Sequence, residues 1–308
     1  MANFKSNYNK FPIVQVSDTD ISCWIGWEAI IDKLKDSLDQ LDKQVRKVVL
    51  ECYQGVIDTE IIPFFQRAFG KNNFIISSDA MLPEQEINAF FREDITDDEL
   101  FGYMPRYNID CFFDKEKVNS IQRYIDTIEG TVIVYGTGAA YICQDPDILI
   151  YADMARWEIQ QRFRRNEVSN IGVNNSFERP SLQYKRAFFV DWRICDRLKK
   201  KLIPHWDYFL DTNNTDSPKM IAADNIRKGL KKAVTQPFRV VPFFDPGPWG
   251  GQWMKEVCDL DRSTHNFAWC FDCVPEENSL LLGFGNAIIE IPAINLVFAF
   301  PEQLLGLP

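Results

Sequence analysis

Histidine is nearly absent from this sequence, and its scarcity limits the metal chemistry that the chain can support. Only two histidines occur in 308 residues, His205 and His265, about 60 positions apart. Catalytic zinc is usually held by at least one histidine and often by two or three that lie close together. The best remaining set is His265 with Cys270 and Cys273, but in an extended strand the two sulfurs would face opposite sides. No metal ligand is therefore assigned in this chain.

Positive charge and long apolar runs are also in short supply. The chain has 34 Lys and Arg against 44 Asp and Glu, which gives a formal net charge of -10 at pH 7. Nucleic acids and anionic membranes select basic surfaces, so neither is an expected partner. No stretch of about 18 apolar residues is present, and the N-terminus lacks the apolar core of a secretory signal. A cytoplasmic protein is expected.

Regular cysteine spacing is the third missing feature. Eight cysteines are scattered through the sequence without the short, repeated intervals of a disulfide scaffold. They are interpreted as mostly buried, reduced thiols.

What the sequence does contain is alternating helical and strand patterns. Hydrophobic residues make up 46% of the chain, enough to bury a large core in two domains. Helices are expected at 27–43, 59–69, 116–128 and 181–202, after Pro83 and from about Met154, and strands at 48–50, 74–76, 131–135 and 148–152. This alternation predicts an α/β fold, a mostly parallel sheet with helices on both faces.

A second, smaller region is expected after a polar stretch at 211–218, which has the composition of a linker. After a short helix at 221–234, apolar runs follow at 238–244, 267–274, 279–282, 287–291 and 296–300. Short runs at close spacing predict antiparallel strands. The predicted organisation is a helical segment (1–44) packed on an α/β domain (45–212), a linker with a helix (213–236) and a mainly β segment (237–308).

The loop at 51–59 is the first candidate site, because it runs from a strand into a helix N-terminus. Free backbone N–H groups and the helix dipole favour an anion at such a place, which makes Gly55, Asp58 and Thr59 candidate phosphate-binding residues. The loop has one glycine and no lysine, so the GxxxxGK[ST] cradle is absent. Gly136-Thr137-Gly138 also follows a strand, but it lacks the third glycine of GxGxxG and is interpreted as a tight turn into a helix.

Residues 45–210 resemble the P-loop kinases that phosphorylate nucleosides and related small molecules. The resemblance rests on Ser77-Ser78-Asp79, on the strand at 147–153, and on the arginines that follow it. It implies that Asp79 is a catalytic base or metal ligand, with ATP and Mg²⁺ as cofactors. It also implies phosphate contacts from Arg156, Arg162, Arg164 and Arg165. The alternative is that Arg162, Arg164 and Arg165 form an exposed helix end and pair with acids such as Glu158 and Glu167.

The segment at 246–253 resembles the entry turn of class I mannose-6-phosphate isomerases, which carry a cupin domain. Its specific part is Trp249-Gly250-Gly251, and Trp269-Cys270-Phe271, 278–283 and Leu304-Leu305-Gly306 follow in the family's order. The whole chain is similar to the N-terminal part of long isomerase-like proteins that place a kinase-like module before the cupin. In that family the zinc ligands come after the point where this sequence stops, so a truncated chain is expected.

Three functions stay open from the sequence. The first is an inactive fragment of a sugar-phosphate isomerase that interconverts mannose 6-phosphate and fructose 6-phosphate, with a small phosphorylated sugar or nucleotide as ligand. The second is a small-molecule kinase. The third is a non-catalytic interaction or regulatory module, in which incomplete sheet edges are covered by a partner or by a second copy as a homo-oligomer.

Overall fold

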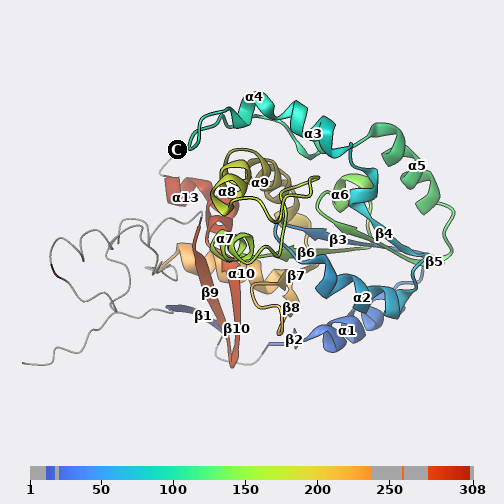
Figure 1. Ribbon diagram of the computed structural model, residues 1–308. Helices are drawn as coiled ribbons and strands as arrows, with labels where there is room; N and C mark the ends of the chain where they lie inside the picture. Colours follow the sequence, from blue (N-terminus) through green and yellow to red (C-terminus); the bar gives the residue numbers. More distant parts are fainter. Residues whose placement is uncertain (1–11, 18–20, 237–258, 260–276, 306–308) are drawn as a thin grey trace, which may run out of the picture. The chain divides into compact units, whose positions relative to one another are not determined.

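The computed structural model describes residues 12–17, 21–236, 259 and 277–305, and these form two compact units (Figure 1). The larger unit comprises residues 22–154 and 158–226, and the smaller one residues 1–21, 155–157 and 227–308. The expected α/β class is confirmed, since the larger unit holds a seven-stranded mixed sheet with helices and the smaller a three-stranded sheet. No helix in the described part of the chain is long and apolar enough to cross a membrane.

The seven-stranded sheet has the order β2-β8-β7-β6-β3-β5-β4. The neighbours from β4 to β7 pair in parallel, whereas β8 is antiparallel to both β7 and β2. The strands are β2 (Cys23–Ile25), β3 (Val45–Cys52), β4 (Phe74–Ile76), β5 (Gly130–Gly136), β6 (Ile148–Asp153), β7 (Tyr208–Asp211) and β8 (Lys219–Ala222).

Helices follow most of these strands. They are α1 (Trp27–Asp39), α2 (Asp58–Phe69), α3 (Glu84–Phe90), α4 (Arg92–Ile95), α5 (Lys115–Ile125), α6 (Ala139–Ile142), α7 (Arg156–Arg164), α8 (Pro180–Arg186), α9 (Trp192–Leu202) and α10 (Ala223–Val234). A π-helical turn at Ala187–Asp191 joins α8 to α9, and a 3₁₀ turn, η1 (Ser77–Ala80), follows β4. Each helix and strand expected between residues 27 and 202 has a counterpart here.

Burial on both sides of the second half of β3 explains the apolar run Val48-Val49-Leu50. Val48 and Leu50 join one core cluster with the buried residues of α1 and α2, such as Leu34 and Phe65. The alternate residues, including Val49 and Glu51, are also buried, and Glu51 faces the start of α6. Because successive side chains in a strand point to opposite faces, a strand covered on both sides needs apolar residues at nearly every position.

The polar stretch at 211–218 does not separate two domains. It joins β7 to β8 as the turn of an antiparallel hairpin within the larger unit. Turn-forming residues occur in both linkers and hairpins, and only the pairing of the flanking strands distinguishes them. The helix α1 likewise belongs to the larger unit, so the boundaries of the structure differ from those expected near 44 and 212.

The smaller unit has the sheet order β1-β9-β10. β1 (Ile13–Ser17) runs parallel to β9 (Ser279–Phe284), and β10 (Ala287–Pro292) is antiparallel to β9. The strand expected at 296–300 is wrong, because α12 (Ile294–Ala299) and α13 (Pro301–Leu305) occupy this part of the chain. A short, buried apolar run has no periodicity that separates helix from strand.

Several expected features lie outside the described residues. They are the strands at 238–244 and 267–274, the residues Trp249, Gly250 and Gly251, and the set His265, Cys270 and Cys273.

Candidate functional site

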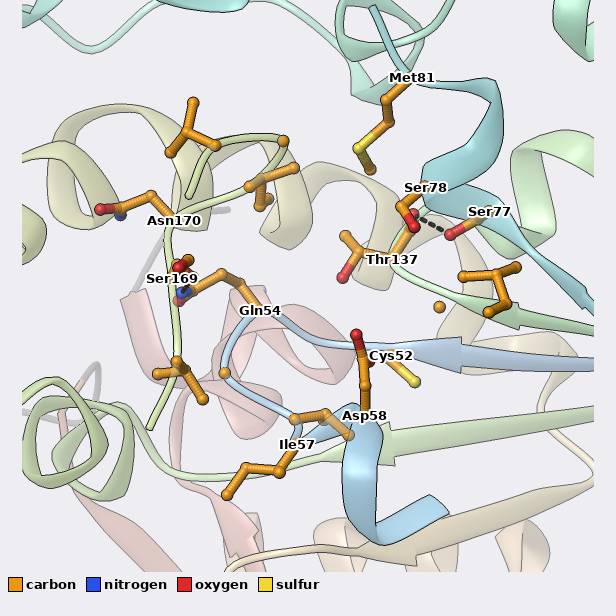
Figure 2. Close-up of a pocket in the computed structure, with 18 of the residues that line it drawn as sticks. Cys52, Gln54, Ile57, Asp58, Ser77, Ser78, Met81, Thr137, Ser169 and Asn170 are labelled. Carbon is orange, nitrogen blue, oxygen red and sulfur yellow. Dashed lines mark hydrogen bonds between the residues drawn. The ribbon is translucent and has the colours of Figure 1, made fainter. Parts of the chain in front are cut away.

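A cavity of about 590 Å³ lies at the carboxyl ends of β3, β4 and β5 (Figure 2). Parallel neighbours end at the same edge of a sheet, so their loops meet there. Four parts of the chain line the cavity. They are the loop at 52–59, residues 76–84 at and after the end of β4 (76–78, 81, 82 and 84), the end of β5 at 135–137, and the chain at 167–174 that follows α7. Figure 2 shows Ser77, Ser78 and Thr137 on one side and Gln54, Ser169 and Asn170 on the other.

The loop after β3 is held against α7. Gly55 has a φ of +101°, and a Cβ there would lie 2.8 Å from the Ile159 side chain, so only glycine fits this position without strain. The Arg162 guanidinium donates to the Gly55 carbonyl at 2.8 Å and to the Thr212 carbonyl at 2.7 Å. The glycine is thus explained by the approach of a helix rather than by a bound phosphate.

Asp58 begins α2 and carries its carboxylate into the cavity. The Tyr135 hydroxyl donates to Asp58 Oδ1 at 2.6 Å. The surrounding protein displaces water from the carboxylate, although the side chain stays reachable by solvent, and this desolvation raises the pKa of Asp58. Burial likewise raises the pKa of the neighbouring Cys52 thiol well above its usual value, so the sulfur is a neutral thiol at neutral pH.

Two buried side-chain amides, of Gln54 and Asn170, hold the cavity wall at 167–174 in place. Gln54 donates through Nε2 to the Ser169 carbonyl at 2.8 Å and accepts from Trp192 Nε1 at 2.8 Å. Asn170 donates to Asp191 Oδ2 at 2.7 Å and to the Gln183 carbonyl at 3.1 Å. Because both side-chain amides already have hydrogen-bond partners in the protein, they fix the shape of the cavity rather than bind a ligand.

The charged side chains that line the cavity are all acidic. They are Asp58, Glu84 and Glu167, and no Lys, Arg or His is among the described residues that line it. An acidic lining repels phosphate and attracts hydrogen-bond donors and cations.

The larger unit coincides with a known sequence family. Residues 26–235 match the family model described as "Domain of unknown function (DUF8485)". The chain belongs to this family. The match begins next to α1 and ends next to α10, so the DUF8485 domain contains the seven-stranded sheet apart from β2, together with the cavity. No protein in the curated set matches the chain.

Within the DUF8485 domain, only some of the residues predicted from the sequence come together. Gly55, Asp58 and Thr59 line the cavity, whereas Asp79 lies exposed in η1 and is not part of the lining. The cavity lining also includes Ser77 and Thr137, which the sequence placed in motifs after two strands but did not assign as site residues. No pattern in the sequence marks the wall at 167–174, which is brought in by its contacts with Gln54.

The four arginines of the kinase resemblance lie outside the cavity lining. Arg162 is fully buried against the loop carbonyls, and burial lowers its pKa. Arg165 is half-exposed and pairs with Glu167 and Glu158 at 2.8 Å each; its hydrogen bond to Glu167 is the main cause of its raised pKa. Arg156 is buried and Arg164 exposed. For Arg162 and Arg165 the contacts are those of the acid-pairing alternative, with backbone carbonyls added.

The Gly136-Thr137-Gly138 segment forms the expected turn between β5 and α6. Glu51, buried on β3, accepts from the Gly138 and Ala140 amides at 2.7 Å each. The Glu51 carboxyl group therefore occupies the position at the start of α6 where an anion would otherwise bind. Across the part of the chain that the structure describes, no group of three or more His, Cys, Asp or Glu side chains is arranged to hold a metal ion.

Proposed function

We propose that the DUF8485 domain of this chain is a degenerate kinase-like domain that binds a small, unphosphorylated polyhydroxy compound and transfers no phosphate. The kinase-like part of the proposal is supported by topology. From β3 the chain moves to β4 and β5 on one side of the sheet and then to β6 and β7 on the other. In open α/β sheets, ligands bind at this reversal, outside the carboxyl ends of the strands.

The charge of the cavity lining carries the second part of the proposal. Phosphoryl transfer depends on cations that neutralise phosphate oxygens. Here the loop lacks the lysine, the lining is acidic, and the Arg162 guanidinium is bonded to two backbone carbonyls. ATP with Mg²⁺ does not fit this set of residues.

A neutral compound rich in hydroxyl groups fits the same residues. Asp58 is an acceptor that receives the Tyr135 hydroxyl, and the hydroxyls of Thr59, Ser78 and Thr137 are donors and acceptors on the cavity wall. Pockets of roughly 300–1,000 Å³ hold compounds the size of a sugar or a nucleoside.

Matched pairs of ligands test the proposal. The full chain is titrated calorimetrically with free hexoses and nucleosides, and with the monophosphate of each. We expect one phosphate-free member to bind about tenfold or more tightly than its phosphate ester, because the ester brings like charge to Asp58, Glu84 and Glu167. ATP with Mg²⁺ should give no heat.

The variant Asp58→Asn is expected to weaken binding of that ligand about tenfold, whereas Asp79→Asn, at an exposed position, should leave it unchanged. Tighter binding of the phosphate ester, or binding of ATP with Mg²⁺, would overturn the proposal in favour of a kinase.

The isomerase hypothesis for a longer parent protein remains a separate proposal. It rests on Trp249, Gly250 and Gly251, which lie outside the described residues. Sequencing of the coding region beyond Pro308 tests it, since a Gln-x-His followed by Glu and His is expected there and a stop codon would count against it.

A further inference from the structure

Large apolar side chains are exposed together on one segment of the larger unit, residues 90–107, here named the aromatic strap. It starts at the end of α3, includes α4 and continues into the chain that follows (Figure 1). Six of the eleven exposed large hydrophobic residues in the described part of the chain belong to it. They are Phe90, Leu100, Phe101, Tyr103, Met104 and Tyr107. Scattered apolar residues are normal on a surface, but a concentration of them marks an interaction site.

Hydrogen bonds hold the backbone of the aromatic strap in this exposed arrangement. The Asp98 carboxylate accepts from the amides of Leu100 and Phe101 at 2.7 Å each. The Tyr103 amide donates to the Asp94 carbonyl, also at 2.7 Å. Arg197 and Lys185, from α9 and α8, donate to carbonyls of the strap at Tyr107 and Asp98.

Close packing beneath the strap adds to this order. A Cβ on Gly102 would lie 2.7 Å from the Asp94 carbonyl oxygen and 3.1 Å from the Phe189 ring. The Tyr107 ring lies 4.9 Å from Phe90 and 6.2 Å from the fully buried Phe91. Because the strap is already ordered without a partner, its own conformational entropy falls little when a partner binds.

We propose that the aromatic strap is a docking surface for a basic amphipathic segment of another protein. Aromatic residues and methionine are the side chains most enriched at the centre of protein interfaces. The exposed charged residues of the segment are mostly acidic, with Glu93, Asp97, Asp98 and Glu99 against Arg92 and Arg106, so the surface suits a partner with apolar residues beside lysine or arginine. A second copy is less suitable, because each copy carries a net charge of -10. The docking surface does not depend on the ligand proposed for the cavity.

A pair of designed peptides tests the proposal on the full chain. One is an amphipathic helix of about 18 residues made of Leu and Lys, and the other replaces each Lys by Glu. Fluorescence anisotropy of the labelled peptides should show binding of the Leu/Lys peptide that is about tenfold or more tighter than that of the Leu/Glu peptide.

Substitutions locate the binding. The double variant Phe101→Ser, Tyr103→Ser should weaken the Leu/Lys peptide about tenfold or more, because these rings are 68% and 70% exposed and fit the role of anchors. The control variant Tyr124→Ser, Phe177→Ser removes two exposed rings elsewhere and should change nothing. Circular dichroism of both variants establishes that the fold is kept.

Three outcomes would overturn the proposal. Equal binding of both peptides would mean that charge plays no part, and equal loss in the control variant would mean that the strap is not the site. A concentration-dependent dimer in sedimentation, abolished by Phe101→Ser, Tyr103→Ser, would assign the surface to a second copy instead.

Discussion

At the scale of single residues, two carboxyl groups near the end of β3 have different roles. Glu51 is buried and accepts two amide hydrogen bonds at the start of α6, whereas Asp58 opens into the cavity and accepts from Tyr135. Burial raises the pKa of Glu51 to about 8, with the Ala140 and Gly138 amides acting in the opposite direction. Glu51 is therefore structural, and Asp58 is the carboxylate that faces the cavity.

The raised pKa of Glu51 predicts a pH-dependent stability. Between pH 4.5, its ordinary value, and about 8, the folded protein holds a proton that the unfolded chain has released. The contribution of this group to the free energy of unfolding is fully present below pH 4.5 and falls as the pH rises to 8. The variant Glu51→Gln does not titrate there. Urea unfolding from pH 5 to 8 measures the free energy of unfolding of both proteins. The wild-type value minus the Glu51→Gln value should fall by up to about 1.4 kcal/mol per pH unit.

Glu116→Gln, at an exposed position of α5, is the control for the change in charge. A wild-type minus Glu51→Gln difference that stays constant from pH 5 to 8 would contradict this titration of Glu51.

At the scale of elements, α7 is joined to the loop after β3 by a buried arginine. Arg162 donates to two backbone carbonyls, at Gly55 and Thr212, while Arg165, the residue after α7, forms ion pairs near the surface. The sequence makes Arg162 and Arg165 equal candidates for phosphate contacts. Their burial assigns them different roles, because a buried guanidinium that donates to backbone carbonyls stabilises the walls of the cavity.

This contrast predicts unequal effects of the same substitution. Arg162→Met should lower the free energy of unfolding by about 2–5 kcal/mol, because two buried carbonyls lose their donors. Arg165→Met should cost at most about 1 kcal/mol, since its partners are accessible to water. Chemical denaturation measures both, and a loss of less than about 1 kcal/mol in Arg162→Met would contradict the framing role.

At the scale of the whole molecule, the smaller sheet joins distant parts of the chain. β1 comes from the first 17 residues, and it pairs in parallel with β9, more than 260 positions later, through contacts such as Ile13 with Leu281. The DUF8485 match covers residues 26–235, so neither strand belongs to the matched region. The small sheet thus lies outside the matched region.

Removal of residues 1–21 should therefore affect the two sheets differently. Without β1, the edge of β9 loses its hydrogen-bonded partner, and amides of residues 280–284 should exchange with solvent faster. Amides of β3, in the interior of the larger sheet, should keep their protection. Hydrogen–deuterium exchange measures both regions, and unchanged exchange in β9 would show that β1 does not protect it.

Sequence pattern alone determined the helices and strands expected between residues 27 and 202, and the loop that faces the cavity. The helical spacing of α1, the apolar run of β3 and the glycine turn into α6 are local signals, because the period of the side chains and the freedom of glycine act within a few residues. The sequence also shows that the loop at 51–59 has no lysine, and this absence by itself argues against a phosphate-binding loop.

Only the tertiary structure decided which residues meet. It placed Arg162 on backbone carbonyls rather than in a lid over phosphate, left Asp79 outside the cavity, and brought the wall at 167–174 against Gln54. It also converted a presumed linker into the β7–β8 hairpin and an expected strand into α12. These outcomes depend on pairing and burial between segments far apart in the chain, and such contacts leave no periodicity in the sequence.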